Sequence, residues 1–194
     1  MEELQALYEA LAAQSAVRFP GQKLVYGVGP LSPLVMLVGE APGAQEVLEG
    51  RPFAGQAGKK LDAFLSATGI PRERLFISNV VKLRPFVSGP SGRRRNRAPS
   101  REEIAFFIPW LEREIGLVRP GLLVALGNTP LQALTEGRRT VGETHGQVLP
   151  SRTGLPLYSL YHPAAVIYNR SLASVYQEDM RRLRDLLQRK GGIQ

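Results

Sequence analysis

Short apolar runs separated by helical segments are the feature of this sequence that most restricts its fold. Four such runs are continuous rather than alternating, which is typical of strands covered on both faces. They span residues 34–38, 75–81, 122–126 and 155–161. Strands that alternate with helices form parallel sheets with helices on both sides. The pattern therefore predicts an α/β fold, a three-layer sandwich with a central four-stranded parallel sheet flanked by helices.

Apolar residues at helical spacing lie between these runs and at both ends of the chain. We expect helices in the first 14 residues, in 58–68, after Ser100, in 129–134 and in 171–189. Ser100 and Glu103 form a capping-box pattern, which marks the start of the third of these helices. A chain of 194 residues can bury a substantial core, so we expect a single domain over residues 1–194.

Polar and flexible residues lie at the carboxyl end of every predicted strand. Gly39 and Glu40 follow the first strand, and Asn79 lies near the end of the second. Asn128 follows the third strand and His162 follows the fourth. In an open parallel sheet these strand ends share one edge, where ligands bind. The sequence therefore predicts one active site at that edge.

The chain is basic, with 25 Lys and Arg against 17 Asp and Glu and a formal net charge of +8. This balance favours a polyanionic partner, although an ordinary basic enzyme would have the same composition. Positive charge is densest in the Gly-, Ser- and Pro-containing stretch 87–98, which we expect to be a flexible loop. Because this loop follows a strand end at the predicted site, we expect it to contact phosphates rather than only solvent. The residues concerned are Arg93, Arg94, Arg95 and Arg97.

The sequence contains no cysteine. This excludes disulfides, thiol nucleophiles and any zinc or iron–sulfur centre held by cysteine in this chain. No apolar run reaches the length of a membrane span, and the first residues do not resemble a signal peptide. We expect a cytoplasmic protein that acts as a monomer without membrane contact.

Three side chains near the predicted edge suit the recognition of a flat heterocycle. Phe53 lies in a glycine-rich loop and could stack on a ring. Asn79 offers an acceptor and two donors, and His162 could donate to an oxygen on which negative charge develops. Taken singly, each of these residue types more often has a structural role. The prediction depends on their order and shared location.

Six motifs occur in a fixed order along most of the chain. They are GEAPG (39–43), GRPFAGQAG (50–58), SNVVKLRP (78–85), NRAP (96–99), LVALG (123–127) and YHPAAV (161–166). In this combination the chain resembles the family 4 uracil-DNA glycosylases, from Val25 to Leu187. The resemblance implies a four-stranded parallel sheet between helices. It also implies an enzyme that extrudes uracil from DNA and hydrolyses its N-glycosidic bond.

The same resemblance implies roles for residues of the motifs. Phe53 would stack on the extruded uracil, Asn79 would read its Watson–Crick edge, and His162 would stabilise the anion that develops at uracil O2. The groups near the sugar and the attacking water would be Glu40, Glu46 and the backbone of Ala41.

The expected partner is uracil-containing DNA, single- or double-stranded. The resemblance implies that the segment after His162 faces the minor groove, with Ala165, Val166 and Ile167 as the residues concerned. Arg170 is expected to face a phosphate, on the ground of its place in the chain rather than of a motif.

The chain departs from the family pattern at several positions. The family carries four cysteines that hold a [4Fe–4S] cluster; two of these positions match Leu83 and Phe107 here, and the amino-terminal pair is missing. We therefore expect no cofactor and no metal, and we expect apolar packing in place of the cluster. Other departures are Gln56 for Arg, Val47 for an acid, His145 for Arg, and an apparent insertion over 87–95.

The sequence leaves three other functions open. The first is a DNA-binding module of the same fold that does not cleave, and the second is a glycosylase for hypoxanthine or xanthine. The third, a nucleotide-binding α/β enzyme, is the weakest, because no GxxxxGKS or GxxxxGKT phosphate loop is present. No lysine occupies a motif position suited to a Schiff base, so we expect hydrolysis without strand nicking.

Overall fold

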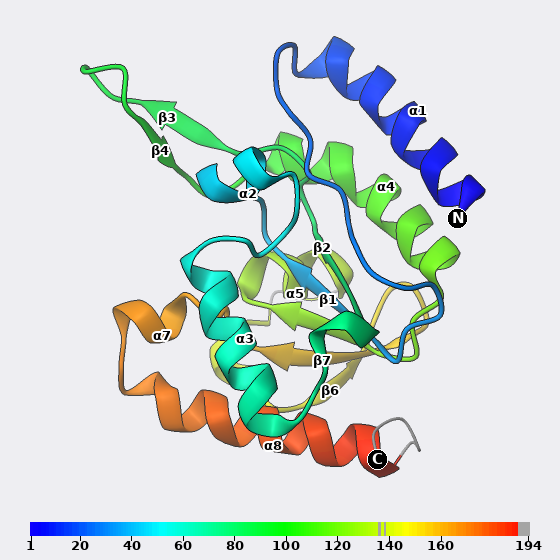
Figure 1. Cartoon of the computed structure of the whole chain (residues 1–194), viewed down its shortest axis with the longest axis vertical. Helices are drawn as coiled ribbons and strands as arrows, with labels where there is room; N and C mark the ends of the chain where they lie inside the picture. Colours follow the sequence, from blue (N-terminus) through cyan, green and yellow to red (C-terminus); the bar gives the residue numbers. More distant parts are fainter. Residues whose placement is uncertain (136, 138, 190–194) are drawn as a thin grey trace.

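A computed structural model describes residues 1–135, 137 and 139–189 of the chain. Its centre is a sheet with the strand order β2-β1-β5-β7-β6 (Figure 1). The first four of these strands run parallel: β2 (Leu75–Asn79), β1 (Val35–Gly39), β5 (Leu123–Leu126) and β7 (Pro156–Leu160). The predicted parallel sheet is confirmed, with strand ends within two residues of the expected ones.

A fifth strand extends the sheet beyond the prediction. Strand β6 (Val148–Pro150) pairs antiparallel with β7 at the edge. Three residues that end in a proline are too few to show any periodicity in the sequence, and proline is tolerated only at an edge or a strand end. The sheet is therefore mixed, with four parallel strands and one antiparallel edge.

Helices cover both faces of the sheet, which confirms the three-layer arrangement (Figure 1). On one face lie α1 (Glu2–Arg18), α4 (Arg101–Val118) and α5 (Asn128–Leu134), and on the other lie α3 (Gln56–Thr68) and α8 (Leu172–Arg189). Side chains alternate between the two faces of a strand, so each strand supplies both cores. In β1, Met36 and Val38 pack under α4, while Val35 and Leu37 pack under α3 and α8.

The start of α4 follows directly from the sequence. Ser100 Oγ accepts a hydrogen bond from the Glu103 N–H at 3.1 Å, and the Glu103 carboxylate accepts one from the Ser100 N–H at 2.7 Å. This is the predicted capping box, which satisfies two N–H groups that the helix itself cannot pair. The capping box fixes the residue at which α4 begins. Helix α4 in turn supplies buried apolar side chains to the core beneath β2.

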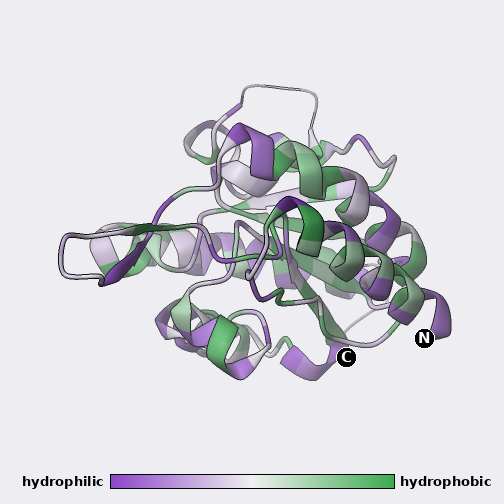
Figure 2. Cartoon of the chain, turned by 90° about the horizontal axis from the view of Figure 1, so that it is seen from above, coloured by the Kyte–Doolittle hydropathy of each residue, from purple (hydrophilic) through white to green (hydrophobic). Residues whose placement is uncertain are grey.

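The prediction of a flexible loop over 87–98 is wrong in part. Strands β3 (Phe86–Ser88) and β4 (Arg94–Asn96) form an antiparallel hairpin that projects from the body of the molecule (Figures 1 and 2). The Gly89 N–H donates to the Arg93 carbonyl at 3.0 Å and closes the turn. The ring of Phe86, with the Arg94 guanidinium 4.4 Å from its centroid, gives the hairpin a small packed base.

Four short elements complete the described chain. They are α2 (Ala44–Glu49), the 3-10 turn η1 (Arg72–Arg74), α6 (Val141–Thr144) and α7 (Ala165–Tyr168). No helix within the described residues has the length and apolarity needed to cross a bilayer. The expected single domain over 1–194 includes residues 190–194, which lie outside the described part.

Candidate active site

A pocket of about 330 Å³ opens at the carboxyl ends of β1, β2 and β7. This is the edge at which the sequence predicts a site. The pocket draws on the loops after β1 and β7, on the end of β2 and on the β3–β4 hairpin. Its lining residues are Ala41, Gly43, Ala44, Gln45, Glu46, Phe53, Gly55, Gln56, Ala57, Asn79, Asn96, His162, Ala164, Ile167 and Tyr168.

Phe53, Asn79 and His162 lie around this one pocket. The ring centroid of Phe53 is 5.7 Å from that of His162, with 30° between the ring planes. Gly39 lies between the other pair, because a Cβ there would come within 2.3 Å of Asn79 Oδ1 and 2.8 Å of the Phe53 ring. An aromatic ring, an amide and an imidazole can therefore contact a common ligand.

The loop that carries Phe53 is held in an uncommon conformation. Phe53 has a φ of 53°, in the left-handed region that a bulky side chain rarely adopts. The Arg72 guanidinium donates to the carbonyls of Pro52 and Phe53, each at 3.3 Å. Helix α3 approaches so closely that a Cβ on Gly58 would lie 1.8 Å from the Phe53 carbonyl oxygen. These contacts fix the ring at the floor of the pocket, where only 6% of the residue is exposed.

His162 is held as a neutral imidazole with a defined donor. The Ala164 N–H donates to His162 Nδ1 at 3.2 Å, so Nδ1 acts as the acceptor and the ring proton belongs on Nε2. Burial lowers the pKa of His162 from 6.5 to about 4, and the charge of Glu46 opposes that shift. At neutral pH the side chain can therefore donate a hydrogen bond without carrying a charge.

The structure separates the two glutamates that the sequence grouped together. Glu46 lines the pocket, and its carboxylate accepts from the N–H groups of Gly43 at 3.0 Å and Gly55 at 2.9 Å. The carboxylate thus joins the two loops and faces the cavity. Glu40 is not among the lining residues; its carboxylate accepts a hydrogen bond from the Thr129 hydroxyl at the start of α5.

Asn128, which the sequence places at the same edge, has a different contact. Its Oδ1 accepts from the Val141 N–H at 2.7 Å, which ties α5 to α6. The residue is outside the pocket lining. Its position at a strand end is as expected, and its side chain supports the neighbouring helices.

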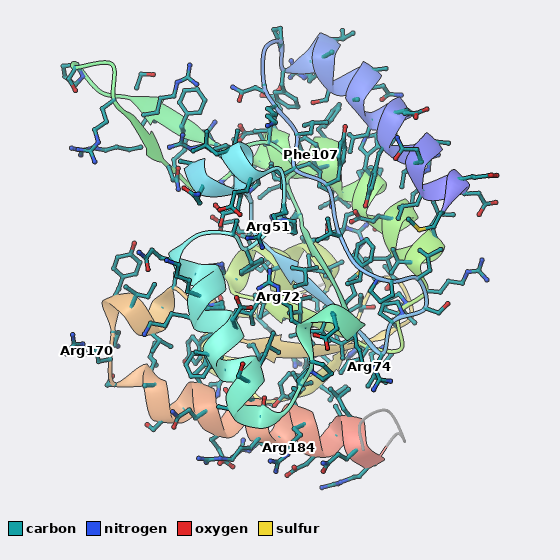
Figure 3. The ribbon with its side chains drawn as sticks, in the orientation of Figure 1. Arg51, Arg72, Arg74, Phe107, Arg170 and Arg184 are labelled. Carbon is teal, nitrogen blue, oxygen red and sulfur yellow. The ribbon has the colours of Figure 1, made fainter. Side chains whose placement is uncertain are left out.

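The segment after His162 divides between core and surface. Val166 is only 8% exposed and packs in the core under α8, and Ala165 is partly buried. Ile167 and Tyr168, which are 40% and 88% exposed, line the pocket rim. Arg170 lies farther along, at the exposed connection between α7 and α8 (Figure 3).

The arginines of the basic stretch lie on the projecting hairpin or at its base. All four are exposed. Arg97 is the one with a defined ion pair, a two-pronged contact to Glu103 with distances of 2.7 and 2.8 Å. Next to them Asn96 lines the pocket, and its Oδ1 accepts from Arg84 Nε at 2.7 Å. The hairpin thus connects the basic surface to the pocket.

Sequence reasoning gave no individual role to several residues of the lining, among them Ala44, Gln45, Asn96 and Tyr168. Gln45 and Ala44 begin α2, Asn96 belongs to the NRAP motif, and Tyr168 ends α7. These residues lie in or beside motifs and helices that the sequence reveals only in part. Each reaches the pocket through a turn, and local spacing does not determine the direction of that turn. Gln56, noted as a departure from the family pattern, also lines the pocket.

The two positions that carry cluster cysteines in the resembling family hold apolar side chains. Leu83 is 2% exposed, and Phe107, which lies on α4 (Figure 3), is fully buried. The Phe107 ring stacks on Phe19 with centroids 5.9 Å apart, and Phe106 meets both rings edge-on at 4.9 and 5.1 Å. No residue of the full sequence is a cysteine. These side chains offer no ligand for iron, so they do not fit an iron–sulfur cluster.

Comparison with known proteins agrees with this geometry. The family model described as the uracil DNA glycosylase superfamily matches residues 26–187. The chain is 41% identical over 163 residues to a type-4 uracil-DNA glycosylase of Pyrobaculum aerophilum, which covers 80% of this chain and 79% of that one. It is 34% identical over 171 residues to the type-4 uracil-DNA glycosylase of Thermotoga maritima, with coverages of 87% and 85%. The match covers most of the chain, and the aromatic ring, the amide and the imidazole line one pocket. The chain therefore belongs to the uracil DNA glycosylase superfamily.

Proposed function

We propose that this protein is a uracil-DNA glycosylase, which hydrolyses the N-glycosidic bond of uracil extruded from DNA and leaves an abasic site. The observation that supports this most directly is the convergence of Phe53, Asn79 and His162 on one pocket. A pocket of about 330 Å³ has room for one pyrimidine and part of its sugar. The curated relatives are named as type-4 uracil-DNA glycosylases, which agrees with the chemistry of the pocket.

Recognition of the base falls to Phe53 and Asn79. Phe53 provides a flat apolar surface on which the extruded ring stacks. The Asn79 amide donates from Nδ2 to uracil O4 and accepts at Oδ1 from uracil N3–H. Cytosine presents an amino group and an unprotonated N3 at these two places, so it meets donor against donor and acceptor against acceptor. In this orientation the amide selects uracil over cytosine.

The chemical step falls to His162 and Glu46. As the bond between C1′ and N1 breaks, its electron pair moves onto uracil and gathers largely at O2. The neutral His162 donates to O2 from Nε2 and stabilises this charge. Water then adds to the cation-like C1′, and its proton passes to the Glu46 carboxylate. Glu46 lines the pocket while its two oxygens accept from Gly43 and Gly55, and it orients that water together with the Ala41 backbone.

Binding of the DNA falls to the hairpin and to the rim of the pocket. Exposed guanidinium groups on the hairpin contact phosphates and release counterions. At the rim, the 88% exposed ring of Tyr168 occupies the space in the stack that the extruded nucleotide leaves. Arg170 adds a phosphate contact beyond α7. We propose that a monomer acts on one lesion.

Both chemical tasks are assigned to side chains of this chain. Stabilisation of the leaving uracil comes from the His162 donor, and activation of water comes from Glu46. Three or more His, Asp or Glu side chains grouped as a metal site do not occur in the described part of the chain. We propose that the rings of Phe19, Phe106 and Phe107 take the structural place of the family's cluster.

The test is a glycosylase assay on end-labelled oligonucleotides, followed by alkali to cut abasic sites. Single-stranded U, U:G and U:A substrates should all give product, and the same oligonucleotides with C or T should give none. Hypoxanthine and xanthine substrates run in parallel identify a different lesion range. Tight binding to uracil DNA without an alkali-sensitive product would instead identify a binding module.

A further inference from the structure

A charged network lies buried directly beneath Asn79. Lys82 and Glu114 are 1% and 0% exposed and lie between the sheet and α4. The Lys82 ammonium donates to Glu114 Oε2 at 2.7 Å, to the Asn79 carbonyl oxygen at 2.8 Å, and to the Ser78 hydroxyl. All three protons of the ammonium group therefore have an acceptor.

Stability alone is a weak reason to keep such a network. Removing two charges from water costs several kcal/mol per ion in general, and apolar residues of similar volume often stabilise a fold as well or better. Burial lowers the pKa of Lys82, and the Glu114 carboxylate opposes that shift. The network also fixes a geometry, because it holds the Lys82 ammonium group as a donor to the Asn79 carbonyl oxygen.

The carbonyl that accepts from Lys82 belongs to Asn79, the residue proposed to read uracil. In β2 the side chain of Ser78 points to the network and the side chain of Asn79 points to the pocket, on opposite faces of the sheet. The strand ends at Asn79, after which the Val80 N–H bonds to the Gly39 carbonyl at 2.9 Å. With Lys82 on the Asn79 carbonyl, the peptide that carries the amide side chain is held from both sides. Recognition groups must keep their place to within about 0.5 Å.

The network reaches back to the first helix. Tyr8 in α1 donates from its hydroxyl to Glu114 Oε1 at 2.6 Å. Gly27 leaves room for this carboxylate, because a Cβ there would lie 2.7 Å from Glu114 Oε1. Helix α1 spans Glu2–Arg18 and lies outside the 26–187 segment that the family model matches. An element beyond the matched segment is thus connected to the base-reading residue by three hydrogen bonds in sequence.

We propose that Lys82 is a positioning residue for Asn79, and that Glu114 and Tyr8 hold Lys82 in place. The inference rests on the proposed function, since it gives Lys82 a part in reading uracil. It predicts that loss of the ammonium group lets the Asn79 peptide rotate. Uracil recognition then suffers, while the binding of undamaged DNA does not change.

The test is a double-mutant cycle. Lys82→Met combined with Glu114→Gln removes both charges together, so no unpaired charge stays buried and Tyr8 keeps an acceptor. Single-turnover uracil release is measured for this variant and for the same changes in an Asn79→Ala background. We expect about a tenfold loss in the presence of Asn79 and less than about twofold in its absence, because coupled residues are not additive. The inhibition constant of free uracil should rise by a similar factor.

Leu11→Ala in α1 is the matched control, because Leu11 is 1% exposed and makes no polar contact in the network. It should lower Tm at least as much while leaving the uracil inhibition constant unchanged. Equal losses with and without Asn79, or an unchanged inhibition constant in the Lys82→Met, Glu114→Gln protein, would overturn the inference alone. A wild-type protein that releases no uracil would overturn the proposed function and this inference with it.

Discussion

The backbone N–H of Ala164 donates a hydrogen bond to Nδ1 of His162 at 3.2 Å. The contact joins two residues of the same tight turn, so it forms as soon as the turn does. It leaves Nε2 as the only ring atom that can carry a proton while the imidazole is neutral. The direction in which His162 donates is therefore set by the backbone rather than by a bound substrate.

The pH dependence of the reaction should reflect this neutral imidazole. Burial lowers the pKa of His162 from 6.5 to about 4, so the group stays neutral until the pH falls near 4. We expect kcat/KM, which reports the free enzyme, to stay level between pH 8 and about pH 5 and to fall below that. Protonation also opposes folding, because the folded pKa is below the unfolded one. Stability should therefore decrease as pH falls from 6.5 toward 4.

His162→Ala separates this role from that of the carboxylates. Loss of a donor to a developing oxyanion costs about 10²–10³ in rate, and the variant should lose that factor together with any acid limb that His162 causes. Rates at each pH are paired with a thermal melt at the same pH. An acid limb centred near 6.5 in the wild-type protein would contradict the assigned state of the ring.

Gly39→Ala should damage the pocket although every side chain proposed to contact uracil keeps its chemical identity. A Cβ at this position would come within 2.3 Å of Asn79 Oδ1 and 2.8 Å of the Phe53 ring, so both must shift. A misplacement of about 1 Å can cost about 10²-fold in rate, and we expect a loss of that order in single-turnover uracil release. Gly116→Ala in α4 is the matched control, because a Cβ there meets nothing within 4 Å. Equal activity of the two variants would argue against the pocket.

The hairpin should contribute electrostatically to DNA binding. Arg93→Ala with Arg95→Ala removes two exposed charges, and affinity for duplex DNA should fall equally for all sequences. If each arginine contacts one phosphate, the slope of log K against log salt should decrease by about 0.9 per contact, or about 1.8 in total. Arg74→Ala with Arg184→Ala removes the same charge far from the hairpin (Figure 3). That pair of changes should leave the slope unaltered.

Tyr168 should matter more for duplex than for single-stranded substrates. Only a duplex has a stack whose gap must be filled when a nucleotide leaves it. Since stacking of a base on an aromatic ring is worth about 1–3 kcal/mol, Tyr168→Ala should slow release from U:A duplex by about tenfold and from single strands far less. Tyr168→Phe keeps the ring and should restore the rate. Val17→Ala, which trims an 85% exposed side chain on α1, serves as the neutral comparison.

Phe107, which occupies one of the two matched cluster positions, should contribute to stability through the rings it packs against. Phe107 is fully buried, and Phe→Ala changes in a core cost about 3–5 kcal/mol. Phe107→Ala should lower the free energy of unfolding by that amount. The pure wild-type protein should contain no stoichiometric iron, and a chelator should leave its Tm unchanged. Iron bound in proportion to protein, with a visible absorbance band, is the result that would reject the proposal.

Much of the fold follows from local sequence. Continuous apolar runs identify the four parallel strands, since a strand buried on both faces has no polar side to reveal. Ser100 and Glu103 mark the start of α4 because capping is a contact between near neighbours. The edge of the sheet follows from strand direction alone, and so the position of Asn79 and His162 could be predicted.

Other features depend on contacts between distant segments, and local sequence does not determine these. Lys82 follows two apolar residues and resembles an ordinary strand-end lysine, yet its partner Glu114 lies 32 residues away. In the segment 165–168, spacing does not reveal that Val166 turns inward and Tyr168 outward. Likewise, Glu40 lies in the GEAPG motif and Glu46 follows it closely in the chain, but of the two only Glu46 lines the pocket. Side-chain direction at a turn is set by the neighbours it packs against.

The rings of Phe19, Phe106 and Phe107 join the end of α1 to α4 with carbon atoms alone. Such a joint is complete once the polypeptide has folded, without assembly machinery to deliver iron and sulfide. It also has nothing that molecular oxygen or peroxide can strip away. A protein closed in this manner keeps its shape where an oxidant would dismantle an exposed cluster.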